Sequence, residues 1–239
     1  MALADCLVGL VANQLAESGA PFIMGGLLSS FDQKSNSRTF GAPEHGLLSS
    51  ALVDVCRYLH IPNYIMGGCT DSKILDAQGS MEAAFFLLSG GLSGANIIQG
   101  CNVLESGDAT SLDLLVMSNE IMGMVKRILR GIEVEDETMA VDVVDEVGPG
   151  GHFLGSEHTI MNFRSETWWP TLMNRKRYDD WCAGGKKTLA QRTNEKTQEI
   201  LKNHQSEPLP EETIAKINEV LAQFDQQGCG IERGDSHEI

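Results

Sequence analysis

The chain has 239 residues with a hydrophobic share of 42%, and its formal net charge at pH 7 is −15. This length is enough for one large domain with a substantial core. The negative charge argues against binding to nucleic acid or to an anionic membrane, since both require a basic face, and no apolar run approaches the roughly 20 residues that cross a bilayer.

The first predicted element is a helix over residues 3–18, where leucine and valine recur at helical spacing before Ser18-Gly19. The stretch lacks the basic start of a signal peptide. The six cysteines of the chain are scattered and form no C-x-x-C pair. We therefore expect reduced thiols and a cytoplasmic location.

Helices and strands alternate in the N-terminal part of the chain. A helix is predicted before each of three strands, and the pairs are 3–18 with 21–26, 44–58 with 62–68, and 76–89 with 95–101. Such alternation predicts parallel strands joined by right-handed crossovers. The polar stretch 27–41 has no apolar period, which predicts either a binding loop or a plain surface excursion.

The remainder of the chain is predicted to be helical. One helix is expected at about 110–130, and another within 131–160, a stretch that carries eight acidic residues and no Lys or Arg. Two polar amphipathic helices are expected at 186–203 and 210–225. The tail from Gln226 has little apolar surface to bury, and we expect it to be disordered.

Four aromatic residues lie close together in this helical part, namely Trp168, Trp169, Tyr178 and Trp181. We expect this cluster to anchor a C-terminal segment against the main domain. The predicted organisation is then an α/β domain over 1–160, a helical region over 161–225 and a tail over 226–239.

Polar side chains follow the second and third predicted strands, where the carboxyl ends of parallel strands line the ligand crevice. The residues predicted to bind a ligand there are Thr70, Asp71, Ser72, Gln99 and Glu105. Asp71 and Glu105 supply carboxylates that can face a cation. The alternative roles are helix capping for Asp71 and Ser72 and ordinary loop hydrogen bonding for Glu105.

Two further residues are candidate ligands of the same substrate. Glu44 stands at the start of helix 44–58, where the helix dipole favours an acid in any case. His152 follows Gly150-Gly151 in a glycine-rich turn that could approach the sheet edge. An ordinary structural role is the alternative for each, and no residue is assigned a catalytic role.

Cys69 and Cys101 fall at the ends of neighbouring predicted strands, which raises the alternative of a zinc site. A catalytic zinc needs three protein ligands, and no spacing supports His45 or His152 as the third. Both thiols are therefore expected to be small buried hydrophobes, and no metal is predicted.

Several motifs appear together in one order: GGCTDSKILDAQ, LSGAN, NVLESG, RILRGIEV and DEVGPGGHFL. Over roughly residues 3–203 the sequence resembles the C-terminal half of the trimethylamine methyltransferase family, which includes enzymes that demethylate glycine betaine. The resemblance implies a (β/α)8 barrel that passes a methyl group from a methylated amine to the cob(I)alamin of a separate corrinoid protein. The chain itself is expected to hold no cofactor tightly.

A closed barrel of this kind needs eight strands and typically about 250 residues. Only three strands are convincing here, so the predicted fold class is α/β, as the C-terminal half of a TIM-type (β/α)8 barrel with an α-helical C-terminal extension. Such a half exposes sheet edges, and we expect it to self-associate or to pair with a complementary N-terminal half.

A quaternary amine is the favoured substrate, because its leaving group is a neutral tertiary amine and methyl transfer then needs no proton. The trimethylamine-specific members of the family use pyrrolysine, whereas this sequence contains only the twenty standard residues. A glycine betaine-like donor is therefore favoured over a tertiary amine. The alternatives are a non-catalytic half-barrel and a zinc-dependent thiol methyltransferase.

Overall fold

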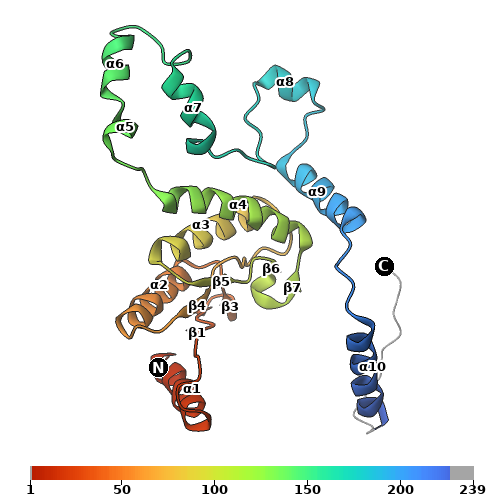
Figure 1. Cartoon of the computed structure of the whole chain (residues 1–239). Helices are drawn as coiled ribbons and strands as arrows, with labels where there is room; N and C mark the ends of the chain where they lie inside the picture. The colour runs from red at the N-terminus through yellow and green to blue at the C-terminus, as the bar shows by residue number, and fades with distance from the viewer. Residues whose placement is uncertain (1, 227–239) are drawn as a thin grey trace. The chain divides into compact units, whose positions relative to one another are not determined.

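The computed structural model describes residues 2–226, in a larger compact unit that ends at Glu199 and a smaller one that begins at Ile200. The centre of the larger unit is a three-stranded parallel sheet in the order β1-β4-β5 (Figure 1). Its strands are β1 (Met24–Gly26), β4 (Asn63–Met66) and β5 (Ile97–Gln99). The sequence prediction of adjacent, parallel strands is confirmed, although each strand is shorter than predicted.

A helix precedes each strand of this sheet: α1 (Ala2–Ala16), α2 (Pro43–Tyr58) and α3 (Ala77–Ser93). Pro43 occupies the first helical turn of α2, where a missing N–H costs nothing. The carboxylate of Asp76 caps α3 by accepting the backbone N–H of Gly79 at 3.0 Å, and Gly94 ends that helix at φ +83°. These local signals explain why the predicted and observed helices agree closely.

The stretch 27–41 is not a structureless loop, because it contains the hairpin β2 (Ser30–Asp32) and β3 (Ser37–Thr39). The carboxylate of Asp32 accepts the hydroxyl of Ser35 at 2.6 Å and the backbone N–H of Lys34 at 3.0 Å, which closes the turn. A second short ladder joins β6 (Val103–Leu104) to β7 (Ala109–Thr110), with the turn η1 (Glu105–Gly107) between them. These strands are only two or three residues long, which is too short for an alternation of apolar and polar residues to be recognised in the sequence.

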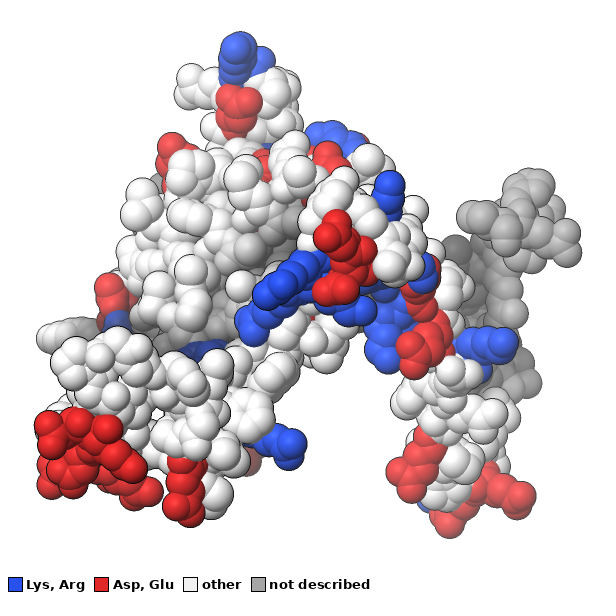
Figure 2. Space-filling view, turned by 90° about the horizontal axis from the view of Figure 1, so that it is seen from above, with Lys and Arg blue, Asp and Glu red and all other residues white. Residues whose placement is uncertain are grey.

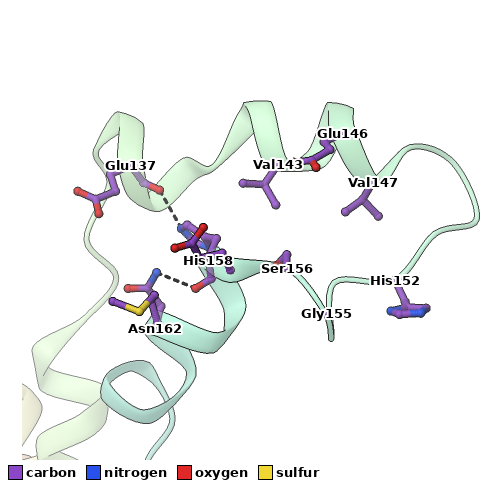
Figure 3. A pocket seen from close by; sticks show the side chains of 11 residues that line it. Glu137, Val143, Glu146, Val147, His152, Gly155, Ser156, His158 and Asn162 are labelled. Carbon is purple, nitrogen blue, oxygen red and sulfur yellow. Dashed lines mark hydrogen bonds between the residues drawn. The ribbon is translucent and has the colours of Figure 1, made fainter.

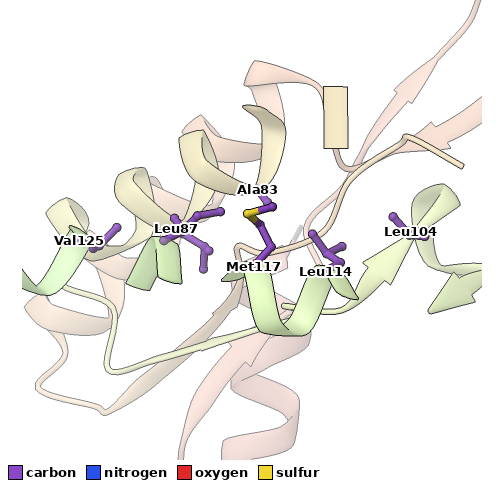
Figure 4. Close-up of a cluster of buried hydrophobic side chains, with 7 residues drawn as sticks. Ala83, Leu87, Leu104, Leu114, Met117 and Val125 are labelled. Atoms are coloured by element: carbon purple, nitrogen blue, oxygen red, sulfur yellow. The ribbon is translucent and has the colours of Figure 1, made fainter. Parts of the chain in front are cut away.

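The main core lies between α3 and α4 (Leu112–Arg130) (Figure 4). The buried residues of this cluster are Ala83, Leu87, Leu104, Leu114, Met117, Ile121 and Val125. A Cβ on Gly91 would lie 2.8 Å from a methyl carbon of Val125, so glycine permits the two helices to approach closely. The face of α4 that packs on α3 carries Leu114, Met117, Ile121 and Val125.

The acidic stretch forms three short helices, α5 (Asp136–Met139), α6 (Val141–Val147) and α7 (Glu157–Glu166). The one helix expected within 131–160 is divided, because Ala140 adopts φ +47° between α5 and α6, and α6 ends at Gly148. Three further helices follow: α8 (Tyr178–Ala183), α9 (Leu189–Asn203) and α10 (Glu211–Gln226). The predicted disordered tail lies beyond Gln226 and outside the described residues.

The segment after α7 is anchored on α4, but by fewer aromatic residues than predicted. Trp168 packs against Gly123, whose added Cβ would lie 2.8 Å from the indole nitrogen. Trp169 and Tyr178 are exposed, at 58% and 71%. The buried side chain of Leu172 also packs there. The backbone N–H groups of residues 171–173 donate hydrogen bonds to the carboxylate of Glu120 in α4.

The strands formed by residues 2–226 do not close into a barrel. Nor does this part of the chain contain a helix that is both long and apolar enough to cross a membrane.

Candidate functional site

The loops that leave β4 and β5 are joined at one edge of the sheet. The backbone N–H groups of Gly67 and Gly68 donate to the carbonyl oxygen of Gln99 at 3.0 and 3.3 Å. The N–H of Thr70 donates to the carbonyl of Val103 at 3.1 Å. A Cβ on Gly68 would lie 2.5 Å from the Cα of Cys101, so this approach requires glycine. The sequence-predicted edge therefore exists as a connected set of loops.

Asp71 is the centre of this edge. Its carboxylate accepts the hydroxyl of Ser106 at 2.6 Å, the backbone N–H of Phe40 at 2.8 Å, and the hydroxyl of Thr39. Partial burial would raise the pKa of Asp71, but hydrogen bonds from Ser106, Thr39 and the backbone of Phe40 and Gly41 outweigh it and lower the pKa. The side chain is ionised, and its lone pairs are used within the protein.

A second carboxylate, which the sequence analysis missed, supports the same loop from α3. Glu82 accepts the hydroxyl of Thr70 at 2.5 Å, the backbone N–H of Asp71 at 2.8 Å and the side-chain amide of Gln78 at 2.8 Å. A Cβ on Gly41 would lie 2.6 Å from the carboxylate atoms of Glu82. Only the i, i+4 spacing from Gln78 to Glu82 is visible in the sequence, and it does not reveal the contacts with the loop.

Thr70 and Ser72 are structural in this arrangement. The Thr70 side chain is fully buried, and its hydroxyl also accepts the backbone N–H of Ser72 at 2.9 Å. The hydroxyl of Ser72 donates toward the carboxylate of Asp76 and the carbonyl of Ile74, each at 2.9 Å. Their polar atoms are occupied inside the protein. The capping alternative for Asp71 and Ser72 is wrong, because the N-cap of α3 is Asp76 and the Ser72 hydroxyl only donates to that carboxylate.

Gln99 and Glu105 lie at the same edge with exposed side chains. The backbone N–H of Glu105 donates to the carbonyl of Ser72 at 2.9 Å, which places it beside the loop after β4. Neither side chain has a hydrogen-bond or ion-pair partner among residues 2–226. The structure thus brings all five predicted edge residues together, and it leaves the side chains of Gln99 and Glu105 free.

Glu44 is exposed in the first turn of α2. Its neighbour His45 is buried between the rings of Phe40 and Phe86, with centroid distances of 5.4 and 5.3 Å. One imidazole nitrogen of His45 faces the carbonyl of Met66 at 3.1 Å, and the other faces the carbonyl of Leu28. His45 therefore connects the stretch after β1 to the end of β4, and both of its ring nitrogens face backbone carbonyls.

His152 does not join the sheet edge. It lines a cavity of about 810 Å³ formed by residues 137–162 of α5, α6, α7 and their connections (Figure 3). On another wall of this cavity, the Nε2 atom of His158 faces the carbonyl of Glu137 at 3.0 Å. The glycine-rich turn predicted to carry His152 to the substrate instead carries it to this separate cavity.

The two cysteines at the edge are packed against apolar neighbours. Cys69 is 1% exposed beside Phe40 and Met66, and desolvation raises the pKa of its thiol to about 12. Desolvation also raises the pKa of Cys101. No cluster of His, Cys, Asp and Glu in residues 2–226 could hold a metal ion. Both thiols have the surroundings expected of small hydrophobes.

Charged side chains are scattered over the face shown in Figure 2. On that face, Asp and Glu lie in several separate places, Lys and Arg lie in several others, and most of the surface carries neither.

The family model and the relatives that match this sequence belong to the same family. The model of the trimethylamine methyltransferase (MTTB) family matches residues 1–228. The trimethylamine methyltransferase MttB of Desulfitobacterium hafniense strain DCB-2 is 35% identical over 226 residues, which cover 93% of this chain and 45% of the relative. MttB of Methanosarcina barkeri strain Fusaro is 35% identical over 230 residues, or 95% and 46% of the two chains.

A glycine betaine methyltransferase of Desulfitobacterium hafniense strain Y51 is similar to the same extent. It is 35% identical over 221 residues, which cover 92% of this chain and 46% of the relative. The chain therefore spans about half the length of the curated relatives it matches. The matches extend along nearly the whole of this sequence, and the chain belongs to the trimethylamine methyltransferase family.

Proposed function

We propose that this chain forms half of a methyltransferase that moves a methyl group from a quaternary amine, with a glycine betaine-like donor favoured, to the cob(I)alamin of a partner corrinoid protein. Family membership supports methyl transfer, and the similarity to a glycine betaine methyltransferase supports the donor. The observation that carries the proposal is the carboxylate-bearing edge of the parallel sheet, where a cation would be attracted.

The proposed architecture of the whole enzyme is a (β/α)8 barrel to which this chain contributes the C-terminal half. The order β1-β4-β5, the parallel registers and the helix before each strand are what consecutive units of such a barrel have. The outer edges of β1 and β5 have no neighbouring strand within the described part of the chain. Further strands, from a complementary half or a second copy, would pair there.

The chemistry of a quaternary donor makes modest demands on the protein. The nitrogen leaves as a neutral amine, so no acid needs to protonate it. The chain has to hold the cation, exclude water and align one methyl group with the acceptor. When the partner's corrinoid is bound, its cobalt supplies the nucleophile. Glu105 at the sheet edge, whose side chain is exposed, fits a cation-binding role.

The alternatives have less support. A zinc-dependent thiol methyltransferase would use cysteine thiolates, whereas burial raises the pKa of both Cys69 and Cys101. The five cysteines in the described part of the chain are free thiols, as is usual for proteins of the reducing cytoplasm. A non-catalytic half-barrel would keep the fold but not the activity.

Reconstitution tests the proposal. The purified chain is assayed for methyl transfer from glycine betaine to cob(I)alamin, alone and with a complementary N-terminal half taken from a relative, while its mass in solution is measured. We expect self-association and little turnover alone, and methyl transfer with the second half. No transfer in either form would contradict the proposal, and full turnover by a monomer would contradict the half-barrel architecture.

A further inference from the structure

One stretch of the C-terminal region has a charge opposite to that of the chain. Residues 175–192 contain six Lys or Arg and two Asp, a formal charge of +4, whereas the whole chain has −15. The stretch comprises α8, its connections and the first residues of α9, and the connections on both sides of α8 come together at the start of α9 (Figure 1). This folding brings side chains from separate positions of the stretch to one place.

A cavity of about 240 Å³ lies where these connections meet. Its cationic side chains come from three positions: Lys176 before α8, Lys187 after it, and Arg192 in α9. Asp180 is the one carboxylate among the described residues that line the cavity, so the lining has a formal charge of +2. The remainder of the wall is neutral and is formed by Thr171, Leu172, Met173, Asn174, Trp181 and Gly184.

The half-buried guanidinium of Arg192 is fixed in this wall. Its Nε atom donates to the carbonyl of Leu172 at 2.7 Å, and its Nη1 atom donates to the carbonyl of Lys187. The same carbonyl accepts the indole N–H of Trp181 at 3.0 Å. A guanidinium has five N–H donors, and the Nη2 atom of Arg192 has no acceptor within residues 2–226. Arg192 therefore keeps donors for a ligand while its orientation is set by the backbone.

The two lysines differ in how far their charge is already neutralised. The ammonium of Lys187 pairs with Glu195 at 2.7 Å. Lys176 is exposed, and its ammonium has no ion-pair or hydrogen-bond partner within residues 2–226. The cavity thus combines a fixed guanidinium that has spare donors with an ammonium that has no partner. An anion with several oxygens satisfies both groups, and a dianion balances the charge of the lining.

We propose that this cavity is a binding site for a phosphate group, either as free phosphate or as part of a small phosphomonoester. Arg192 donates to the phosphate oxygens, and Lys176 and Lys187 supply the positive charge that attracts the dianion. This inference goes beyond the proposed methyl transfer, because the cavity shares no lining residue with the sheet edge. Its failure would leave the proposed function unaffected.

Calorimetric titration of the 239-residue chain with inorganic phosphate tests the proposal, at about pH 7.5, where phosphate is mainly the dianion, and at constant low ionic strength. We expect Lys176→Gln to weaken phosphate binding roughly fivefold. Asp180→Asn should strengthen it by a similar factor, because it removes a negative charge from the lining. The matched control is Arg177→Gln, which removes one charge from an exposed side chain beside Lys176 that does not line the cavity. It should leave the affinity within about twofold.

The role of Arg192 needs a measurement of folding beside the measurement of binding. Arg192→Lys retains the charge but loses the planar set of donors, and we expect weaker phosphate binding together with a lower melting temperature, since Arg192 also holds two carbonyls. The Lys176 and Asp180 variants should keep the wild-type melting temperature, because neither side chain has a partner within residues 2–226. Their opposite effects on affinity therefore test the site independently of stability.

Phenyl phosphate distinguishes the two sources of the phosphate group. Tighter binding of phenyl phosphate than of inorganic phosphate would identify a phosphomonoester site, and equal or weaker binding would identify a site for free phosphate. A wild-type chain that binds neither compound overturns the proposal. Equal weakening by Lys176→Gln and Arg177→Gln also overturns it, because phosphate would then be attracted by the basic surface in general and not by the cavity.

Discussion

Thr171 donates both its backbone N–H, at 3.0 Å, and its hydroxyl, at 2.6 Å, to the buried carboxylate of Glu120 on α4. The N–H groups of Leu172 and Met173 donate to the same carboxylate at 2.8 and 3.0 Å. Three consecutive backbone donors thus converge on one side chain. This contact anchors the segment after α7 on the core.

Replacing Glu120 with alanine should detach this segment. The three buried or half-buried N–H groups would lose their acceptor, at a cost of about 1–3 kcal/mol in the free energy of unfolding. Glu120→Gln should cost less, because its carbonyl oxygen can still accept the backbone donors. Urea unfolding measures the cost, and limited proteolysis of residues 167–188 locates it.

Asn119→Ala is the control for this change, because Asn119 is the exposed neighbour of Glu120 in the same helix. It should leave both the unfolding free energy and the proteolysis pattern nearly unchanged. Equal stability of Glu120→Ala and Asn119→Ala would show that the segment does not depend on the carboxylate.

The same carboxylate should make stability depend on pH. Burial by itself would raise the pKa of Glu120, but hydrogen bonds from Thr171, Met173 and Leu172 outweigh it, so its pKa lies below the ordinary 4.5. A depressed folded-state pKa means that the contribution is fully present above pH 4.5 and is lost as the pH falls through the lower, folded-state value.

Unfolding free energies measured from about pH 6 down to about pH 3 check this expectation. The wild-type chain should lose more stability over that interval than Glu120→Gln, which has no proton to bind at this position. Parallel pH profiles for the two proteins would refute the assignment.

Gly41→Ala should disturb the loop after β4 through Glu82. The new Cβ would lie 2.6 Å from the carboxylate, so Glu82 must move and release its bonds to Thr70 and Asp71. We expect a loss of about 1–3 kcal/mol in unfolding free energy. The loss should be much smaller in a Glu82→Ala background, which a double-mutant cycle measures.

Gly26→Ala provides a matched control, because a Cβ there meets no atom within 4 Å. It should be tolerated in either background. If Gly41→Ala lowers the unfolding free energy equally in the Glu82→Ala background, the alanine methyl group must clash with an atom other than the Glu82 carboxylate.

Cys69 should resist alkylation in the folded chain. Its thiol is buried and its pKa is raised to about 12, so little thiolate forms near neutral pH. Iodoacetamide labelling at about pH 8, followed by mass spectrometry, should modify the half-buried Cys182 first and Cys69 only after denaturant is added. Rapid native labelling of Cys69, or one zinc ion per purified chain, would revive the thiol methyltransferase alternative.

The sequence by itself determined the elements whose causes are local. The alternation of helices and strands predicted the parallel sheet, and Asp76 and Gly94 mark the ends of α3 within a few residues of the prediction. These signals depend on spacing along the chain, so they can be read without knowing the fold. The position of the polar edge of the sheet followed in the same way, because polar residues come directly after β4 and β5.

Only the tertiary structure decided which polar residues of that edge are free. Asp71 and Glu105 look equivalent in the sequence, yet the donors that occupy Asp71 come from Thr39 and Ser106, which are 32 and 35 residues away. Likewise, Ala140 breaks a helix that apolar periodicity predicts to continue. Donors so distant in the sequence meet a carboxylate only after the sheet has brought their loops to one edge, and no local pattern records that convergence.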